Sequence, residues 1–350
     1  MFWLTLLAFI VILGLLIFVH EAGHFIVAKL SKVKVEEFAF GFPPRIYSVK
    51  RGETNYSINL IPFGGYVKML GEEKSSDSPR AFNRKKPITR LGIVVAGVVM
   101  NFILAGFLLS AGYMIGMPPI RLDPQMIGGA QTHQVVIAQI NDGSSAQKAD
   151  LRVGDLVVGF GSVEDFSAFT RNNLGESIDL SVKRDGQTLD KVVEVSKDLQ
   201  APLGVGIVDV PIIKLGFFKA IYAGFVEMGL TTGYITVMLG RFIADLFHGK
   251  SVGSEIAGPI GIFNVTGQAV KMGFTYIVQL AALLSINLGL INILPIPALD
   301  GGRAVLIVAE AVARRKVIRE EVENVMHTIG FAVLILLILL ISAKEVIGLF

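Results

Sequence analysis

The chain has 350 residues, of which 52% are hydrophobic and 17% charged, and its mean hydropathy is +0.62. This composition excludes an ordinary soluble protein and is typical of a membrane protein that carries a soluble insert. The formal net charge of +3 gives no indication of nucleic-acid binding. The chain contains no cysteine, so disulfides and thiolate zinc ligands are excluded, and any metal must bind histidine or carboxylate groups.

The first apolar segment, Phe2–Ala28, is long enough to cross a bilayer, which requires about 20 residues. It lacks the basic start and the cleavage site of a signal peptide, so we expect transmembrane helix 1 within residues 1–30. Near its end it reads H-E-A-G-H, which on a helix puts two imidazoles one turn apart on one face. The pattern predicts His20 and His24 as zinc ligands and Glu21 as general base. The alternative, a helix with two incidental histidines, would leave costly ionisable groups in hydrocarbon.

Residues 31–87 contain three expected strands, 45–50, 54–61 and 66–70, joined by turns at 51–53 and 62–65. The second turn is too apolar for a comfortable aqueous loop. We therefore expect a hairpin on the cytoplasmic side that dips toward the active site, where protein or water must line its backbone. A small cytoplasmic sheet beside the membrane is the alternative.

Three further segments, 88–117, 275–300 and 328–349, are apolar enough to cross the bilayer, which gives a multi-pass α-helical protein with four transmembrane helices. In the second of them, Gly112 and Gly116 form either a helix-packing face or simply two of the glycines common in membrane helices.

Basic residues are concentrated after the first span and in the loop 301–327. Cytoplasmic loops carry such an excess of Lys and Arg, so we expect both loops in the cytoplasm. Both termini and the region between the second and third spans are then extracytoplasmic, and the active site lies toward the cytoplasmic side.

The soluble part of that region, 126–200, contains expected strands at 135–140 and 178–183. Residues 151–158, L-R-V-G-D-L-V-V, are similar to the core of a PDZ domain, a module that binds a peptide by adding a strand to a sheet edge. A β-rich spacer without a ligand is the alternative. Residues 205–270 follow as expected interfacial helices, because charged residues interrupt the apolar stretch 217–247.

A catalytic zinc site uses three protein ligands and a water, so the two histidines need a partner. The best candidate is Asp300, which ends the run N-I-L-P-I-P-A-L-D-G-G at the cytoplasmic end of the third span. The prolines break that helix and free backbone groups near the histidines. Taken alone, Asp-Gly-Gly would also fit a simple helix stop.

These features together resemble the site-2 protease family of intramembrane zinc metalloproteases (peptidase M50-like), most closely its bacterial RseP type. The resemblance covers nearly the whole chain and rests on six segments: the H-E-x-x-H at 20–24, F-G-F-P at 40–43, P-F-G-G-Y-V-K-M at 62–69, the PDZ-like insert, G-P-I-G-I at 258–262, and the N-x-x-P-x-P-x-L-D-G run at 292–301. One departure is that the insert has room for one PDZ domain, whereas many family members carry two.

The resemblance implies that His20, His24 and Asp300 bind Zn²⁺ and that Glu21 activates the zinc-bound water. It further implies a membrane-embedded endopeptidase of a bacterial inner membrane that performs regulated intramembrane proteolysis. The expected substrates are single-pass membrane proteins such as anti-sigma factors or remnant signal peptides, and a peptide or substrate tail would occupy the PDZ domain.

The resemblance also implies substrate-binding residues. Asn287 and Asn292 match family asparagines, which we assign to the substrate backbone or the oxyanion, and the hairpin at Gly64 and Gly65 is similar to an element that clamps the substrate as an added strand.

Two other functions fit parts of the sequence. The first is a catalytically idle, PDZ-bearing membrane adaptor with a structural metal site, and the second is a metal transporter. A closed structural zinc site needs four protein ligands, and only three are identifiable. A transporter needs a polar path, and few polar residues interrupt the apolar segments. The remaining histidines, His133, His248 and His327, are expected away from the metal site.

Overall fold

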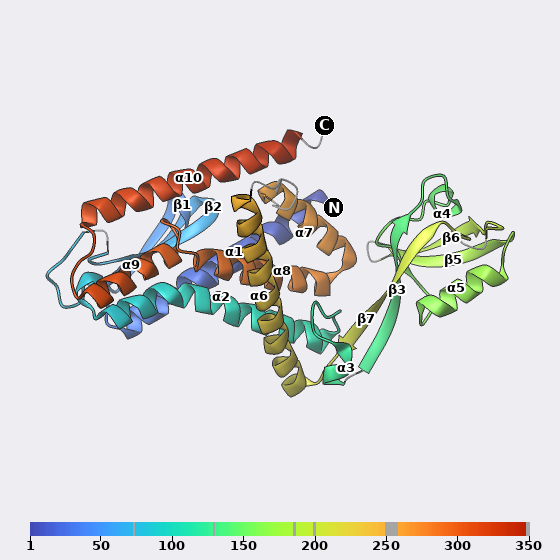
Figure 1. The fold of residues 1–350 in the computed structure, drawn as a ribbon, viewed down its shortest axis with the longest axis horizontal. Helices are drawn as coiled ribbons and strands as arrows, with labels where there is room; N and C mark the ends of the chain where they lie inside the picture. The colour runs from blue at the N-terminus through green and yellow to red at the C-terminus, as the bar shows by residue number, and fades with distance from the viewer. Residues whose placement is uncertain (73, 129, 185–186, 199–200, 249–257, 348–350) are drawn as a thin grey trace. The chain divides into compact units, whose positions relative to one another are not determined.

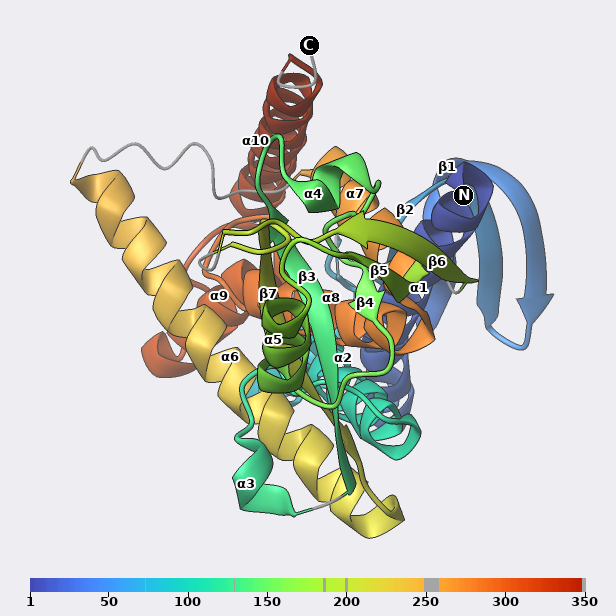
Figure 2. The same cartoon turned by 90° about the vertical axis from the view of Figure 1, so that its right-hand side faces the viewer.

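A computed structural model describes residues 1–72, 74–128, 130–184, 187–198, 201–248 and 258–347. These residues form two units, one of residues 1–107, 228–266 and 281–350 (unit one) and one of residues 108–227 and 267–280 (unit two). Figures 1 and 2 show the helices α1 (Phe2–Leu30), α2 (Pro87–Ile115), α3 (Pro124–Ile127), α4 (Ser145–Lys148), α5 (Val163–Asn172), α6 (Phe217–Phe247), α7 (Pro259–Met272), α8 (Phe274–Asn292), α9 (Asp300–Ala313) and α10 (Glu320–Ile347). A short 3₁₀ helix, η1 (Phe82–Arg84), precedes α2. The strands are β1 (Val35–Arg51), β2 (Thr54–Met69), β3 (Ala130–Ile140), β4 (Leu156–Val157), β5 (Ser177–Arg184), β6 (Gln187–Glu194) and β7 (Val205–Lys214).

Four of the described helices, α1, α2, α8 and α10, are long and apolar enough to cross a membrane. Their side chains fit that environment: on α10, for example, Leu336 and Leu339 are 57% and 60% exposed. A soluble protein would not expose a continuous apolar surface of this kind. The fold therefore fits the multi-pass membrane protein expected from the sequence.

The third apolar helix ends earlier than the sequence predicts. α8 stops at Asn292 instead of continuing to residue 300, because Pro295 and Pro297 lack the backbone donors that a helix requires. The chain then turns and starts α9 at Asp300. A helix thus occupies most of the first half of the stretch 301–327, where a loop was expected.

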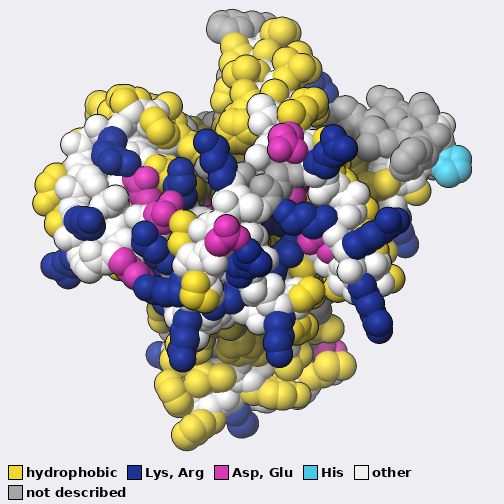
Figure 3. Space-filling model, turned by 90° about the vertical axis from the view of Figure 1, so that its left-hand side faces the viewer, with side chains coloured by type: hydrophobic (Ala, Val, Ile, Leu, Met, Phe, Trp, Pro, Cys, Tyr) yellow, Lys and Arg dark blue, Asp and Glu magenta, His cyan; other side chains and the backbone are white. Residues whose placement is uncertain are grey.

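Lys and Arg side chains gather on the face that Figure 3 shows. In unit one, exposed basic residues lie in the segments that join α1 to β1, β2 to α2, and α9 to α10: Lys32, Lys74, Arg80, Lys86, Arg314, Arg315, Lys316 and Arg319. This is the charge distribution that cytoplasmic segments of membrane proteins carry.

The sheet of unit one is made from two strands that both bend. Phe38 of β1 pairs with both Tyr56 and Val67 of β2, and Ser57 of β2 pairs with both Ala39 and Ser48 of β1. The result is four arms in the order 65–69, 35–40, 54–59, 45–51, in which the two middle arms run in the same direction and each outer arm runs antiparallel to its neighbour.

Residues 62–65, predicted as a turn, are assigned to β2, and the chain reverses direction between its two arms 54–59 and 65–69, as the prediction required. The positive-φ residue Gly64 accommodates the bend. The arm 65–69 (the edge arm) pairs with residues 35–40 on one side. Within the described residues no strand pairs with its other side.

One apolar core joins the elements of unit one. Ala28 at the end of α1, Val67 on β2, Ile93 on α2 and Ile307 on α9 are all less than 9% exposed and belong to one cluster. The helix ends and the edge arm therefore hold fixed positions relative to one another.

Unit two contains a five-stranded antiparallel sheet in the order β6-β5-β4-β3-β7. Phe166 of α5 is buried in its core. β7 pairs with β3 from Val205 opposite Ile140 to Lys214 opposite Ala130, which makes the long ribbon visible in Figure 1. The sheet therefore extends to residue 214, so the predicted boundary at residue 200 is too early, and β7 replaces the start of the expected interfacial helices.

The apolar stretch 217–247 forms a single helix, α6, and one of its charges is buried. The Glu227 carboxylate accepts hydrogen bonds from the Tyr113 hydroxyl at 2.5 Å and from the backbone N–H groups of Arg121 and Leu122 at 2.6 and 3.2 Å. Since buried carboxylates are tolerated when they are fully hydrogen-bonded, this charge secures the segment after α2.

A second buried charge closes the turn before β4 in unit two. The Asp155 side chain is 1% exposed and accepts a hydrogen bond from the Arg152 backbone N–H at 2.8 Å. Arg184 on β5 donates to both carboxylate oxygens, at 2.6 and 2.7 Å. This bidentate ion pair links the turn to the neighbouring strand, β5.

Replacing Arg184 should therefore unfold the sheet of unit two more readily. Arg184→Ala leaves the buried Asp155 carboxylate unpaired, which costs about 3–5 kcal/mol. Arg152→Ala, which removes a 65% exposed guanidinium, should cost about 0–1 kcal/mol. Hydrogen exchange of the β5 amides in the full-length protein measures both, and equal effects of the two variants would contradict this assignment.

Candidate metal centre and active site

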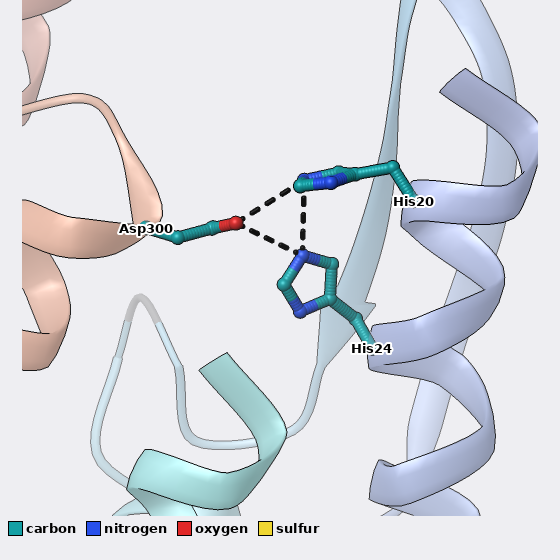
Figure 4. A group of neighbouring side chains, drawn as sticks. All are labelled: His20, His24 and Asp300. Atoms are coloured by element: carbon teal, nitrogen blue, oxygen red, sulfur yellow. Dashed lines mark hydrogen bonds and ion pairs between the residues drawn. The ribbon is translucent and has the colours of Figure 1, made fainter. Parts of the chain in front are cut away.

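His20 and His24 lie one turn apart on α1 and point toward Asp300 at the start of α9, as Figure 4 shows. The Nε2 atoms of the two imidazoles are 3.3 Å apart. They lie 3.1 and 3.3 Å from the same carboxylate oxygen, Oδ2 of Asp300. Three potential ligand atoms thus converge on one point, and both histidines are 8% exposed.

The chemistry of these three donors fits zinc. On a tetrahedral zinc ion with bonds of about 2.0–2.1 Å, neighbouring ligand atoms are roughly 3.3 Å apart, which matches the observed separations. Oδ2 of Asp300 is buried and has no hydrogen-bond partner among the described residues. A bound cation would satisfy this oxygen and both nitrogens at once.

A close crossing of α1 and α2 brings the backbone of α2 against the imidazoles. A side chain at Gly97 would collide with the His24 and His20 rings, and one at Gly23 would lie 2.5 Å from the carbonyl oxygen of Ala96. Small residues allow membrane helices to approach in this way.

The sequence singled out a different glycine pair for helix packing. In unit two, Gly112 lies against Met117, directly after α2, and Gly116 lies against Ile212 on β7.

Both imidazoles are also held at their second nitrogen. Nδ1 of His24 lies 2.8 Å from the Ile93 carbonyl oxygen, and Nδ1 of His20 lies 3.1 Å from the side-chain amide of Asn101. Donation from Nδ1–H leaves the Nε2 lone pair for a metal. The amide nitrogen of Asn101 faces Nδ1 of His20, and its buried oxygen has no hydrogen-bond partner among the described residues. With the amide turned over, this oxygen would accept a hydrogen bond from Nδ1–H of His20, as the Ile93 carbonyl does from His24.

Sequence reasoning gave Asn101 no role, although a lone Asn in the apolar helix α2 was visible. Because it is 0% exposed, its amide must serve a specific partner.

Removing the Asn101 amide should weaken zinc binding. We expect Asn101→Leu to lower zinc affinity about 10–100-fold, the usual effect of losing a partner of a metal-bound imidazole. Competition with a chelator measures this. Asn101→Asp, which offers an acceptor, should bind zinc more tightly than Asn101→Leu, and equal affinities for the two would contradict the assignment.

A pocket of about 340 Å³ lies beside the three donors and is lined by parts of α1, the β2 bend, α8 and α9. Glu21, Gly64, Gly65 and Asn292 line it, whereas Asn287 does not. A side chain at Gly65 would lie 2.8 Å from Cγ of Glu21, so glycine lets the strand pass close to this carboxylate.

The amide nitrogen of Asn292 is 3.4 Å from Nε2 of His20. This asparagine is therefore next to the three converging donor atoms.

An ion pair joins two walls of the pocket. Arg303, one turn after Asp300 on α9, pairs with Glu72, which also accepts a hydrogen bond from the Met69 backbone N–H at 3.0 Å. Burial disfavours the charge on Arg303, but the Glu72 carboxylate outweighs it and raises the pKa of the guanidinium. The end of the edge arm is thereby tied to the helix that carries Asp300.

Comparison with known proteins identifies the family of the chain. A model of peptidase family M50 matches residues 8–337. The chain belongs to peptidase family M50. This confirms the expected relation to the site-2 protease family of zinc metalloproteases.

Curated relatives of this M50 peptidase come from several bacteria. A protein of Clostridium acetobutylicum, whose name assigns it provisionally to the zinc metalloproteases, is 38% identical over 95% of both chains. A similarly named protein of Fusobacterium nucleatum is 33% identical over 99% of this chain and 100% of its own. RasP of Bacillus subtilis, whose name is "Regulator of sigma-W protease RasP", is 29% identical over 100% of both chains. The M50 peptidase is thus a bacterial membrane metalloendopeptidase with zinc as its cofactor.

Proposed function

We propose that this M50 peptidase cleaves single-pass membrane proteins inside the bilayer. The observation that carries the proposal is the convergence of His20 and His24, on the apolar helix α1, with Asp300, in the short segment after the apolar helix α8. These groups lie beside the edge arm, whose outer side pairs with no described strand. Four transmembrane helices, extracytoplasmic termini and an active site toward the cytoplasmic side are part of the proposal. The basic segments of unit one support this orientation.

The chemistry assigns one role to each side chain. His20, His24 and Asp300 hold zinc, which supplies a Lewis acid that activates water and polarises the peptide carbonyl. Glu21, between the histidines and on the pocket wall, accepts the proton of the attacking water and passes it to the leaving amine. Asn292, close to His20, is suited to donate to the oxyanion or the substrate backbone.

Asn287 does not line the pocket in the described part of the chain. Its assignment to the substrate therefore rests on the family resemblance and requires a longer contact surface than the pocket itself.

The edge arm is suited to hold an unwound substrate. A transmembrane helix buries its carbonyls in internal hydrogen bonds, so it must open locally before hydrolysis. Pairing with residues 65–69 would replace the lost bonds, as in peptide recognition by strand addition. Gly64 and Gly65 line the pocket at the start of this arm, which supports their assignment to substrate binding.

The sheet of unit two is proposed to be a PDZ domain that binds a peptide or substrate tail outside the cytoplasm. Its antiparallel strands and the turn around Asp155 support this assignment. The name "Regulator of sigma-W protease RasP" joins a protease to a sigma factor. It supports our proposal of regulated intramembrane proteolysis, with anti-sigma factors or remnant signal peptides as the substrate class.

A catalytically idle adaptor is not favoured. A closed structural zinc site has four protein ligands. Among the described residues three metal-binding side chains converge, and a pocket adjoins them, so a coordination position stays available for water and substrate.

Replacing Glu21 tests the mechanism directly. Glu21→Gln should reduce cleavage of a model single-pass substrate by at least about 10²–10⁴-fold, the usual contribution of a general base, because the amide cannot accept the proton. Zinc content should equal that of the wild type, whereas Asp300→Ala should lose zinc. The assay compares purified proteins in detergent, and undiminished cleavage by Glu21→Gln would contradict the assignment of Glu21 as general base.

Strand pairing is tested from the substrate side. N-methylation of single substrate amides beside the scissile bond should lower kcat/KM at every second residue, roughly 2–10-fold per lost hydrogen bond. Intervening methylated positions should react like the unmodified peptide. An effect that does not alternate would contradict pairing with the edge arm while leaving the zinc chemistry intact.

A further inference from the structure

α10 contacts the catalytic elements through a small part of its surface. His327, Gly330 and Phe331 have the spacing i, i+3 and i+4, so they lie on one face of the helix. We call these three residues the contact face. Much of the remaining surface of α10 is exposed and apolar, as expected for contact with lipid.

The contact face holds the turn that leads to Asp300. Nδ1 of His327 accepts a hydrogen bond from the backbone N–H of Ala298 at 2.9 Å. Ala298 has φ +82°, a left-handed conformation that is unfavourable for a residue with a side chain. It persists only if its surroundings fix it, and within the described residues His327 makes the one side-chain hydrogen bond to the turn 293–299.

Gly330 permits this contact. A side chain there would meet the Pro297 carbonyl, whose carbon would be 2.7 Å away. Beside the contact, a second pocket of about 370 Å³ adjoins Ala298, Asp300 and His327. Because open space lies on this side of the turn, packing alone does not fix it.

Phe331 reaches the opposite wall of the active site. Its ring contacts that of Phe42 on β1, with centroids 6.0 Å apart. The Phe42 ring in turn fills the space beside Gly64, where a side chain would lie 2.8 Å from its Cζ. α10 therefore touches the metal-ligand turn directly and the start of the edge arm through one ring.

A second attachment fixes the rotation of α10. Glu345 follows His327 by 18 residues, which is five helical turns, so both lie on the same side of the helix. The Glu345 carboxylate accepts hydrogen bonds from the backbone N–H groups of Gly258 and Gly261 at the start of α7, at 2.7 and 3.0 Å. The two anchors keep the contact face turned toward the active site.

We infer that α10 positions both walls of the catalytic pocket, with His327 fixing the turn of Asp300 and Phe331 supporting the strand edge at Gly64. His327 is thus a positioning residue for a metal ligand, although sequence reasoning expected it away from the site. The inference rests on the proposed function for its substrate part, while its metal part depends on zinc binding alone.

Zinc affinity tests the role of His327. We expect His327→Ala to weaken zinc binding about 10–100-fold in a chelator competition, as the loss of a group that orients a metal ligand does. His327→Asn, whose amide oxygen can accept at the position of Nδ1, should restore the wild-type affinity. His327→Gln keeps the bulk of the side chain but displaces the acceptor, so it should lower zinc affinity as His327→Ala does. This variant therefore tests the hydrogen bond even if His327→Ala folds poorly.

The matched control is Leu336→Ala, 57% exposed and nine residues from His327 on the opposite side of α10. It should bind zinc like the wild type. Equal zinc affinities for His327→Ala, His327→Gln and Leu336→Ala would overturn the positioning role.

Substrate kinetics test the role of Phe331. Phe331→Ala should raise KM for a single-pass substrate while zinc affinity stays at the wild-type level, and Phe331→Leu should recover part of the loss. An unchanged KM for Phe331→Ala, or a loss of zinc equal to that of His327→Ala, would overturn this part. If the wild type cleaves no substrate, the proposed function fails, whereas the zinc measurements still decide the role of His327.

Discussion

The structure depends on one electrostatic constraint, which is that two imidazoles and a carboxylate converge in largely apolar surroundings. Such groups are stable there only when a cation and further hydrogen bonds satisfy them. The requirement explains why α2 crosses α1 closely enough for Ile93 and Asn101 to reach the imidazoles. It also explains why the chain breaks after α8, since an unbroken helix could not return Asp300 to the level of the histidines.

A second constraint concerns the backbone. Peptide groups in hydrocarbon must be hydrogen-bonded, and in the proposed membrane location the outer side of the edge arm would violate that rule. Here the edge arm adjoins a pocket with polar lining, and the Arg303–Glu72 ion pair ties its end to α9. A strand edge without a neighbouring strand is ordinarily a liability, but in a peptidase it is suited to bind an extended peptide.

The sequence predicted the parts of the site that follow from local spacing or from ligand chemistry. H-E-x-x-H fixes one face of one helix, and the demand for a third oxygen ligand pointed to Asp300. Features set by distant contacts were missed. The pairing of both arms of β2 with one segment of β1 and the assignment of β7 to the sheet depend on strand register, and the roles of Asn101 and His327 depend on partners more than 25 residues away. Of the two predicted asparagines, Asn292 lines the pocket and Asn287 does not.

The lengths of the apolar helices differ in a way that concerns the lipid. α1 and α2 have 29 residues each and α10 has 28, so each is about 42–44 Å long, well beyond a hydrocarbon core of about 30 Å. They can tilt to suit bilayers of different thickness. α8 has 19 residues and is about 28 Å long, with no surplus to tilt. Since the chain reaches Asp300 directly from α8, we expect acyl chain length to change the depth of this ligand, which makes membrane thickness a physical variable of the catalytic centre.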